Sequence, residues 1–216
     1  KITRQTRFDP SIGVYGLLKR YHAPLEEQVA GLIHDVSHSA FSHCADYISG
    51  DQETQKSQSH QDSIFSNFVR GTEIPAILDR HGLDIEYILN DDHFPLKETA
   101  LPDLCADRID YSLRSALALS ILSEHECAKI LNSLTVWNSK WVFQDHASAK
   151  SFAEMFDLLN TRCYSHFLSA AMMHCTGHCL QHAMQRGYLT HEDLYTNDAT
   201  VLDKITIHLD SDPELR

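Results

Sequence analysis

Three histidines and one aspartate that could bind a metal ion lie within ten residues of one another, at His34, Asp35, His38 and His43. Imidazole nitrogen and carboxylate oxygen together suit a divalent transition metal ion. His38 follows His34 by four residues, so both side chains would lie on one helix face if the helix before them continues. The segment therefore predicts one half of a metal site.

Two further acidic residues, Asp107 and Asp110, lie three residues apart in a later segment with a helical pattern. Taken alone, the pair is more simply explained as solvated acids that pair with neighbouring arginines. The earlier His34-Asp35 pair reverses this preference, because a site for phosphoester hydrolysis combines a few neutral histidines with ionised aspartates and leaves positions for water and substrate. We therefore expect His34, Asp35 and Asp107 to converge from two helices.

The elements that must position these residues are mostly helices, because apolar residues recur every three or four positions along much of the chain. Pro10 fits the first position of the first helix, with Asp9 as its cap. Aromatic and β-branched runs around an Asn-Ser turn predict one small β-hairpin at residues 134–143. Helices are expected at residues 10–21, 25–35, 41–48, from 60 to 69, 73–80, 84–89, 102–122, within 147–187, and at 191–195 and 199–209, and the polar residues 51–59 are expected to form an exposed loop.

These elements predict an all-α fold with one small hairpin, as a single domain over residues 1–216 with its core at roughly 7–187. Hydrophobic residues make up 43% of the chain and charged residues 22%, which is ordinary for a globular protein. The chain starts at Lys1 without a methionine. This start leaves open that the chain is a trimmed fragment.

Charge and cysteine content narrow the function classes. The net charge of −12 argues against a broad nucleic-acid surface, and no apolar run reaches the about 18 residues that cross a membrane. Six cysteines without a CxxC spacing predict reduced thiols in a cytoplasmic protein. A small anionic substrate stays compatible, because a metal ion and a few arginines can supply local positive charge. A homo-oligomer is left open.

Three motifs in this order resemble those of the HD-superfamily phosphohydrolases. They are RFDPSIGV at residues 7–14, GLIHDVSHSAFSH at residues 31–43 and DRIDY at residues 107–111. The pattern is most similar to the deoxynucleoside triphosphate triphosphohydrolases, with motifs such as RFEHSLGV, HDxGHxPFSH and DKxDY. The resemblance extends in patches from Arg7 to about His166.

The resemblance implies an HD-type all-α core and metal-dependent hydrolysis of a phosphate ester of a nucleotide or another small phosphorylated metabolite. It implies that His34, Asp35 and Asp107 bind a divalent ion, which would be Mn, Co, Ni, Mg, Fe or Zn. It also implies a polar relay that helps to protonate the leaving group, and a set of positions that approach the substrate. The relay is His38, Asp46 and His60, and the substrate-binding positions are Arg7, His43, Arg108, Tyr111 and Tyr164.

Four positions depart from the pattern of the triphosphohydrolases. Pro10 aligns with the first metal histidine and offers no ligand atom, so three protein ligands remain where four are usual. Gln61 stands where many members have a glutamate after the histidine that matches His60. Ser115 and Phe167 stand in place of a sugar-binding aspartate and a phosphate-binding lysine. Three ligands with water can still hold a catalytic ion.

Two other functions remain open. A catalytically weakened HD protein would bind a nucleotide or a partner as a sensor or scaffold, and the residues Pro10 and Gln61 favour this alternative. A di-iron oxygenase of the HD type would need more His and Asp ligands than the three assigned here. Metal content, nucleotide binding and dioxygen consumption distinguish these functions.

Histidines also recur at every fourth position at His174, His178 and His182. This spacing can bind zinc, but no carboxylate or cysteine in another motif supports it, so a packing role is the preferred interpretation. Trp137 and Trp141 of the predicted hairpin are also interpreted as packing residues, because the acidic charge disfavours base stacking.

Overall fold

A computed structural model describes residues 6, 8–48 and 60–216, without the side chains of residues 45 and 60–63. The chain divides into two compact units. The first unit comprises Lys1–Val36 and Glu73–Tyr164, and the second unit comprises Ser37–Thr72 and Ser165–Arg216. The predicted all-α fold with one small hairpin is confirmed. That residues 1–216 form one domain stays a prediction.

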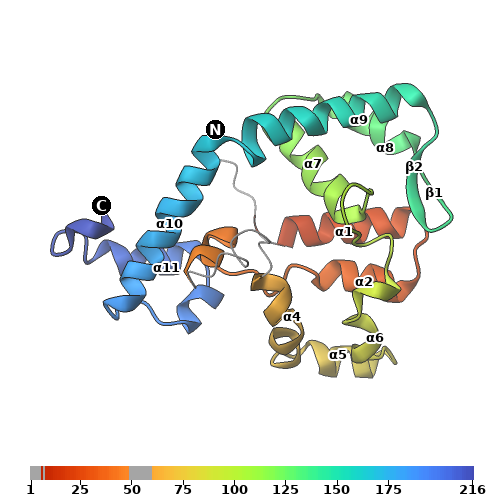
Figure 1. Ribbon diagram of the computed structural model, residues 1–216. Coiled ribbons are helices and arrows are strands. Elements are labelled where there is room, and N and C mark those ends of the chain that lie inside the picture. Colours follow the sequence, from red (N-terminus) through yellow and green to blue (C-terminus); the bar gives the residue numbers. More distant parts are fainter. Residues whose placement is uncertain (1–5, 7, 49–59) are drawn as a thin grey trace. The chain divides into compact units, whose positions relative to one another are not determined.

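The main apolar core of the first unit lies among α1 (Phe8–Arg20), α7 (Ala106–Ala118), α8 (Glu124–Ser133) and α9 (His146–Leu159), and α2 (Leu25–Ile33) packs on α1. α1 packs against α2 and α7, and α9 packs against α7 and α8 (Figure 1). Each helix turns an apolar face inward, so that Val14, Leu18 and Ile109 are fully buried. The core thus fixes α1, α2 and α7, which carry the predicted site motifs, against one another.

Two shorter helices of the first unit agree with their predicted ranges. They are α5 (Ile74–Arg80) and α6 (Ile85–Ile88). The side chain of Asp84 caps α6 by accepting a hydrogen bond from the backbone nitrogen of Glu86 at 2.9 Å. A 3₁₀ turn at Asp91–His93 follows and leads toward the start of α7.

The hairpin forms at the predicted position, with β1 (Leu134–Trp137) paired antiparallel to β2 (Lys140–Phe143). Asn138 and Ser139 adopt φ values of 49° and 57° in the turn, as a two-residue hairpin loop of this kind requires. Trp141 is 4% exposed and donates a hydrogen bond from Nε1 to the carbonyl oxygen of Leu96 at 2.9 Å. The packing role predicted for Trp141 is confirmed, whereas Trp137 is 68% exposed.

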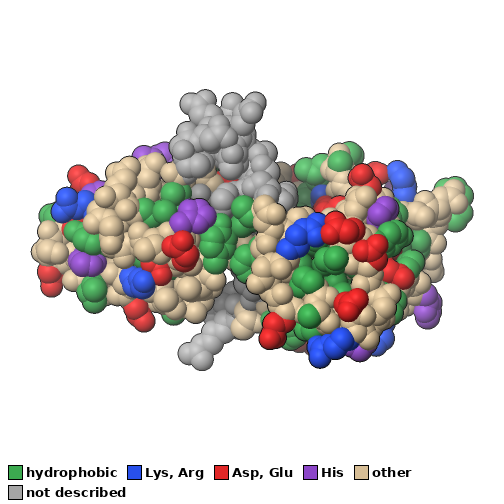
Figure 2. All heavy atoms as spheres, turned by 90° about the horizontal axis from the view of Figure 1, so that it is seen from below, with side chains coloured by type: hydrophobic (Ala, Val, Ile, Leu, Met, Phe, Trp, Pro, Cys, Tyr) green, Lys and Arg blue, Asp and Glu red, His purple; other side chains and the backbone are tan. Residues whose placement is uncertain are grey.

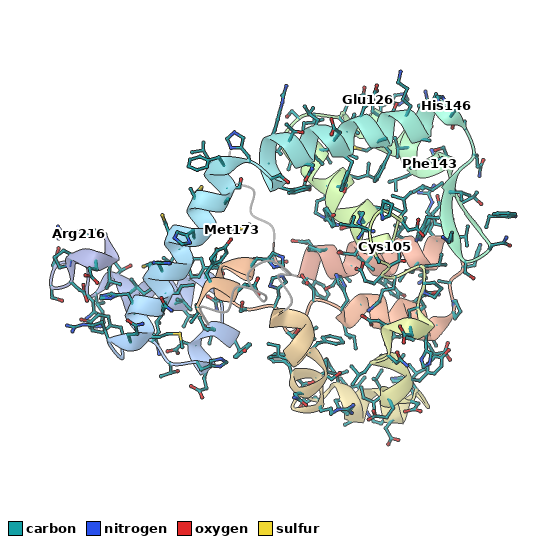
Figure 3. The ribbon with its side chains drawn as sticks, viewed as in Figure 1. Cys105, Glu126, Phe143, His146, Met173 and Arg216 are labelled. Carbon is teal, nitrogen blue, oxygen red and sulfur yellow. The ribbon has the colours of Figure 1, made fainter. Side chains whose placement is uncertain are left out.

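α7 is shorter than the helix predicted at residues 102–122. It begins after Cys105, whose Sγ accepts a hydrogen bond from the backbone nitrogen of Arg108 at 3.4 Å (Figure 3). Cysteine is an uncommon N-cap, and Pro102 resembled a helix start more closely. The helix ends before Ser120, which adopts a φ of 57° in the left-handed region that a helix cannot continue through.

α8 was missing from the sequence prediction although its start carries a recognisable signal. Ser123 and Glu126 form a capping box, in which the Ser123 hydroxyl accepts from the Glu126 backbone at 3.3 Å and the Glu126 carboxylate accepts from the Ser123 backbone at 2.8 Å. The S-x-x-E pattern before an apolar run is the sequence signature of this motif. Figure 3 labels Glu126 at this end of the helix.

The helices predicted within residues 147–187 are α9 in the first unit and α10 (Phe167–Gln185) in the second, after a π-helical turn at Asn160–Tyr164. The second unit also contains α4 (His60–Arg70) and α11 (Asp198–Thr206). Its core joins Leu180 of α10 to Val201 of α11 and to Ala40. The helix predicted at residues 41–48 is a 3₁₀ helix at Ser42–Tyr47, which packs on α10. Short 3₁₀ turns at Glu192–Tyr195 and Pro213–Leu215 complete this unit.

No helix in the described part of the chain is both long and apolar enough to cross a bilayer. On the face drawn in Figure 2, Lys and Arg side chains are interspersed with Asp and Glu side chains rather than gathered in one basic patch. This distribution agrees with the net charge of −12.

Candidate metal centre

His34 follows the last turn of α2 and faces Asp107 in the first turn of α7. The Nδ1 atom of His34 lies 2.8 Å from the carbonyl oxygen of Gly31, and because a carbonyl only accepts, Nδ1 carries the proton. The Nε2 atom lies 3.3 Å from Oδ1 of Asp107, and the two side chains are 13% and 27% exposed. In the neutral ring, the Nε2 lone pair therefore points at a carboxylate oxygen.

Two such acceptors repel unless a proton or a cation lies between them. The pKa of His34 is held above its usual value: burial lowers it, but the hydrogen bond and charge of Asp107 and the charge of Asp35 outweigh burial. A metal ion can replace this proton. Two ligands bound at about 2.1 Å from one ion at a tetrahedral angle lie about 3.4 Å apart, so the observed spacing fits a shared ion.

The third predicted ligand, Asp35, is half-buried beside His34. Its charge acts on His34, but within residues 6, 8–48 and 60–216 no group of three or more His, Cys, Asp or Glu side chains converges to hold a metal ion. The structure thus brings together His34 and Asp107, and the role of Asp35 as a ligand stays a prediction.

Hydrogen bonds to the segment Leu96-Lys97 set the distance between α2, which His34 follows, and α7, which carries Asp107. The carboxylate of Glu27 on α2 is 3% exposed and accepts hydrogen bonds from the backbone nitrogens of Leu96 and Lys97 at 2.7 and 3.0 Å. The carbonyl oxygens of the same two residues accept from the backbone nitrogens of Ala106 and Asp107 at 2.7 and 3.4 Å. One dipeptide therefore joins α2 to the first turn of α7.

A second connection fixes α7 to α1. Arg114 binds the carboxylate of Asp110 through Nε and Nη2 at 2.9–3.0 Å, and its Nη2 also donates to the carbonyl oxygen of Asp9 at 3.2 Å. One interpretation of the sequence made Asp110 a solvated acid. In the structure its side chain is only 15% exposed and is paired with Arg114. Burial raises the pKa of Asp110 more than the adjacent Arg114 lowers it.

The position of the missing first ligand lies in the first turn of α1. This helix begins at Phe8, so Asp9 is not its N-cap as predicted, and Pro10 is its third residue. The carboxylate of Asp9 instead accepts hydrogen bonds from the backbone nitrogen and the hydroxyl of Thr6 at 2.7 and 2.9 Å, which lower its pKa. Asp9 is therefore engaged with Thr6, and Pro10 supplies no donor.

Arg108 holds the segment before α7. Its guanidinium donates to the carbonyl oxygens of Asp103 and Thr99 and lies 3.8 Å from the carboxylate of Glu98. The side chain is 11% exposed, so a structural role is established, and its contact with substrate stays a prediction.

Two tyrosines predicted to bind substrate lie together. The rings of Tyr111 and Tyr164 pack in a T-shaped arrangement, with centroids 5.8 Å apart. Burial raises the pKa of Tyr111 to about 12, although the nearby Arg108 lowers it, and burial also raises the pKa of Tyr164. Both phenols are therefore neutral donors near pH 7. Arg7 lies outside the described residues.

The remaining predicted residues belong to the second unit, where three of them cluster. The His38 ring lies edge-on to His43 with centroids 5.2 Å apart, and His43 Nδ1 is 3.4 Å from Oδ2 of Asp46. Asp46 is 3% exposed. The spacing of three residues places His43 and Asp46 on one face of the 3₁₀ helix Ser42–Tyr47, beside His38 as the resemblance implied. The side chain of His60 lies outside the description.

The stripe of histidines on α10 is not a metal site within the described residues. His182 lies between two carboxylates, with Nε2 at 2.9 Å from Asp212 and Nδ1 at 3.0 Å from Glu214. The ring of His174 contacts that of His178, with centroids 4.2 Å apart. His182 thus holds the C-terminal turn in place through two carboxylates that the sequence did not indicate, whereas His174 and His178 are exposed.

Comparison with known proteins finds similar chains, among them a protein named as a phosphohydrolase. No protein-family model matches the chain. The chain is 36% identical over 209 residues to uncharacterized protein YdhJ of Bacillus subtilis, covering 92% of this chain and 60% of that protein. It is 36% identical over 137 residues to metal-dependent phosphohydrolase cns2 of Cordyceps militaris, covering 63% and 38%. It is 28% identical over 156 residues to uncharacterized protein MG461 homolog of Mycoplasma pneumoniae, covering 58% and 37%.

The chain thus spans less than two thirds of the length of each of these relatives. One of these relatives, cns2, is named as a metal-dependent phosphohydrolase.

Proposed function

We propose that the chain is a metal-dependent phosphohydrolase of the HD type that cleaves a phosphate ester of a nucleotide or another small phosphorylated metabolite. The observation that carries the proposal is the approach of His34 Nε2 to Asp107 Oδ1 at 3.3 Å. The 36% identity to metal-dependent phosphohydrolase cns2 supports it.

His34 and Asp107 would hold the divalent ion, and Asp35 is proposed as a further ligand. A bound divalent ion in such a site polarises a phosphoryl oxygen and lowers the pKa of the attacking water. The bond from His34 Nδ1 to Gly31 orients the ring so that Nε2 is the binding atom. Glu27 and the Asp110–Arg114 pair keep the supporting helices in place.

The remaining roles come from the resemblance and are part of the proposal. Tyr111 and Tyr164, as neutral phenols, would donate hydrogen bonds to the substrate, together with Arg7, His43 and Arg108. Transfer of the proton to the leaving group is assigned to His38, Asp46 and His60. Among nucleotides, the deoxynucleoside triphosphates are the first substrates to test, although Ser115 and Phe167 replace two residues that those enzymes use.

The test is phosphate release by metal-free protein reloaded separately with Mn²⁺, Co²⁺, Ni²⁺ or Mg²⁺, on a panel of nucleotides and phosphate esters. We expect turnover with at least one ion, and a loss of kcat/KM of more than about 100-fold in His34→Ala and Asp107→Asn. The exposed residues His125 and Asp157 provide matched controls, and His125→Ala and Asp157→Asn should retain activity. Absence of phosphate release with every ion would refute the proposal.

A second function is favoured by one observation, namely that only two predicted ligands converge in the described part of the chain. A protein with weak metal affinity would bind a nucleotide without cleaving it and act as a sensor or scaffold. Thermal-shift measurements with the same panel separate the two functions. A raised Tm without phosphate release supports the sensor, and a raised Tm with release supports the enzyme.

A further inference from the structure

The first unit contains a cavity of about 360 Å³ that the proposed reaction does not use. It lies among α1, α7 and α8, and the side chains of His34 and Asp107 do not line it. This volume is within the range of small-ligand sites. Its walls are mainly apolar, and the lining residues are Gly13, Gly16, Leu17, Arg20, Ile109, Asp110, Leu113, Arg114, Leu117, Cys127 and Leu131.

Two glycines one helical turn apart shape the α1 side of this cavity, and they differ in what surrounds them. A Cβ added at Gly13 would lie 2.0 Å from Asp110 Oδ1, so that position is occupied by the Asp110–Arg114 pair. A Cβ added at Gly16 would meet nothing within 4 Å. Gly16 therefore leaves open space beside the helix, and a larger side chain there would extend into space that a ligand could occupy.

The charged groups of the lining are two arginines and one aspartate, which gives the cavity a net positive charge. Asp110 is neutralised by Arg114 through paired hydrogen bonds. Within the described residues these bonds of Arg114 run through Nε and Nη2, which leaves the N–H groups of Nη1 available. Arg20 uses Nη2 to bind Asn132 Oδ1 at 2.6 Å and is itself exposed.

We propose that this cavity binds a small monocarboxylate with a short apolar chain. The leucine and isoleucine side chains cover the apolar chain, and the carboxylate pairs with guanidinium groups, which match its planar geometry. A cationic ligand would place a second positive charge beside Arg20 and Arg114. A polyanion such as a triphosphate would be only partly neutralised by one net positive charge.

Octanoate is the probe, with octan-1-ol and octylamine as neutral and cationic analogues of equal chain length. We expect saturable octanoate binding to the wild-type chain by calorimetry, weaker binding of octanol, and none of octylamine. Gly16→Leu should weaken octanoate binding at least tenfold, whereas the matched variant Gly16→Ala should stay within threefold. Arg20→Met, which keeps an apolar stem, should reduce the preference for octanoate over octanol.

A second measurement does not depend on the folding of a variant. Cys127 lines the cavity but is buried, and burial raises the pKa of its thiol, so it is alkylated slowly even without ligand. Cys175 is an exposed cysteine of the second unit. Octanoate should slow the alkylation of Cys127 in the wild-type chain and leave Cys175 unchanged, as followed by peptide mass spectrometry. Equal affinity for octanoate and octylamine, binding unaffected by Gly16→Leu, or unprotected Cys127 at saturating octanoate would each overturn the proposal. Because binding is measured without turnover, the outcome is independent of the phosphohydrolase function.

Discussion

Gly13 of α1 lies so close to Asp110 of α7 that a Cβ at Gly13 would fall 2.0 Å from the carboxylate oxygen Oδ1. The same Cβ would lie 2.4 Å from Nη2 of Arg114. A glycine at this position is therefore what allows the buried ion pair to connect the two helices.

Gly13→Ala should lower the free energy of unfolding by about 1–3 kcal/mol, because the added methyl group overlaps the Asp110–Arg114 pair. Gly16→Ala on the same helix is the control. It adds the same methyl group in open space and should stabilise the chain by up to about 1 kcal/mol through helix propensity. Urea unfolding of the two variants measures both effects. Equal effects of the two substitutions would contradict the proposed overlap.

Pro10→His places an imidazole at the position that matches the first metal histidine. If that match is correct, the affinity for Mn²⁺ or Co²⁺ should rise at least tenfold, or about 1.4 kcal/mol. Ile12→His, two residues later and 43% exposed in the wild type, is the control and should leave the affinity unchanged. Calorimetric titration of metal-free protein gives both values. Unchanged affinity in Pro10→His would show that the motif is misaligned at this position.

The free energies of unfolding of the wild type and of Glu27→Gln should differ by an amount that depends on pH. Burial raises the pKa of Glu27 above 4.5, although the hydrogen bonds from Leu96 and Lys97 oppose the shift. A carboxyl group with a higher pKa in the folded state binds more protons there, so the wild type loses stability relative to Glu27→Gln as pH rises from about 4.5 through the folded pKa. Above the folded pKa, the difference in the free energy of unfolding between the two proteins should no longer change with pH.

The glutamine amide oxygen can still accept both backbone hydrogen bonds, so the comparison isolates the charge. Urea unfolding of both proteins at several pH values between 4 and 8 gives the difference in the free energy of unfolding. A difference that does not change with pH would mean that Glu27 titrates alike in the folded and unfolded chains.

His182→Ala should lower Tm by about 2–4 °C, because the ring holds the C-terminal turn through Asp212 and Glu214. His178→Ala, one turn earlier on the same helix and exposed, is the matched control and should shift Tm by less. Thermal unfolding monitored by circular dichroism compares the two. Similar shifts would assign no stabilising role to the two carboxylates.

The sequence predicted the elements whose signals are local. The apolar spacing from Leu25 to Ile33 predicted α2, although the helix ends at Ile33, two residues before the predicted end at residue 35, and the Asn138-Ser139 turn places the hairpin. The start of α7 was predicted four residues too early, because Pro102 resembles a helix start and Cys105 does not resemble a cap. α8 was missed although Ser123 and Glu126 form a standard capping pattern.

Only part of the candidate site could be predicted, because some of its contacts depend on residues of another helix. The approach of His34 to Asp107 followed from two motifs that carry metal-binding residue types. The buried pairing of Asp110 with Arg114 depends on the absence of a side chain at Gly13, on another helix. The spacing of four residues indicated that Asp110 and Arg114 pair, but the burial of the pair has no signature in the sequence around Asp110. The open space at Gly16 is likewise defined by what neighbouring helices leave unfilled.

The hydrogen bonds of Leu96 and Lys97 set the distance between the two candidate ligands, His34 and Asp107. This distance therefore does not depend on the length of the segment that precedes α7. Glu27 binds this dipeptide from one side, and Ala106 and Asp107 bind it from the other. Residues 98–105 therefore form a loop whose two ends are already joined. Lengthening such a loop costs little free energy, so this segment can accept insertions, or be exchanged between related chains, while the distance from His34 to Asp107 is preserved.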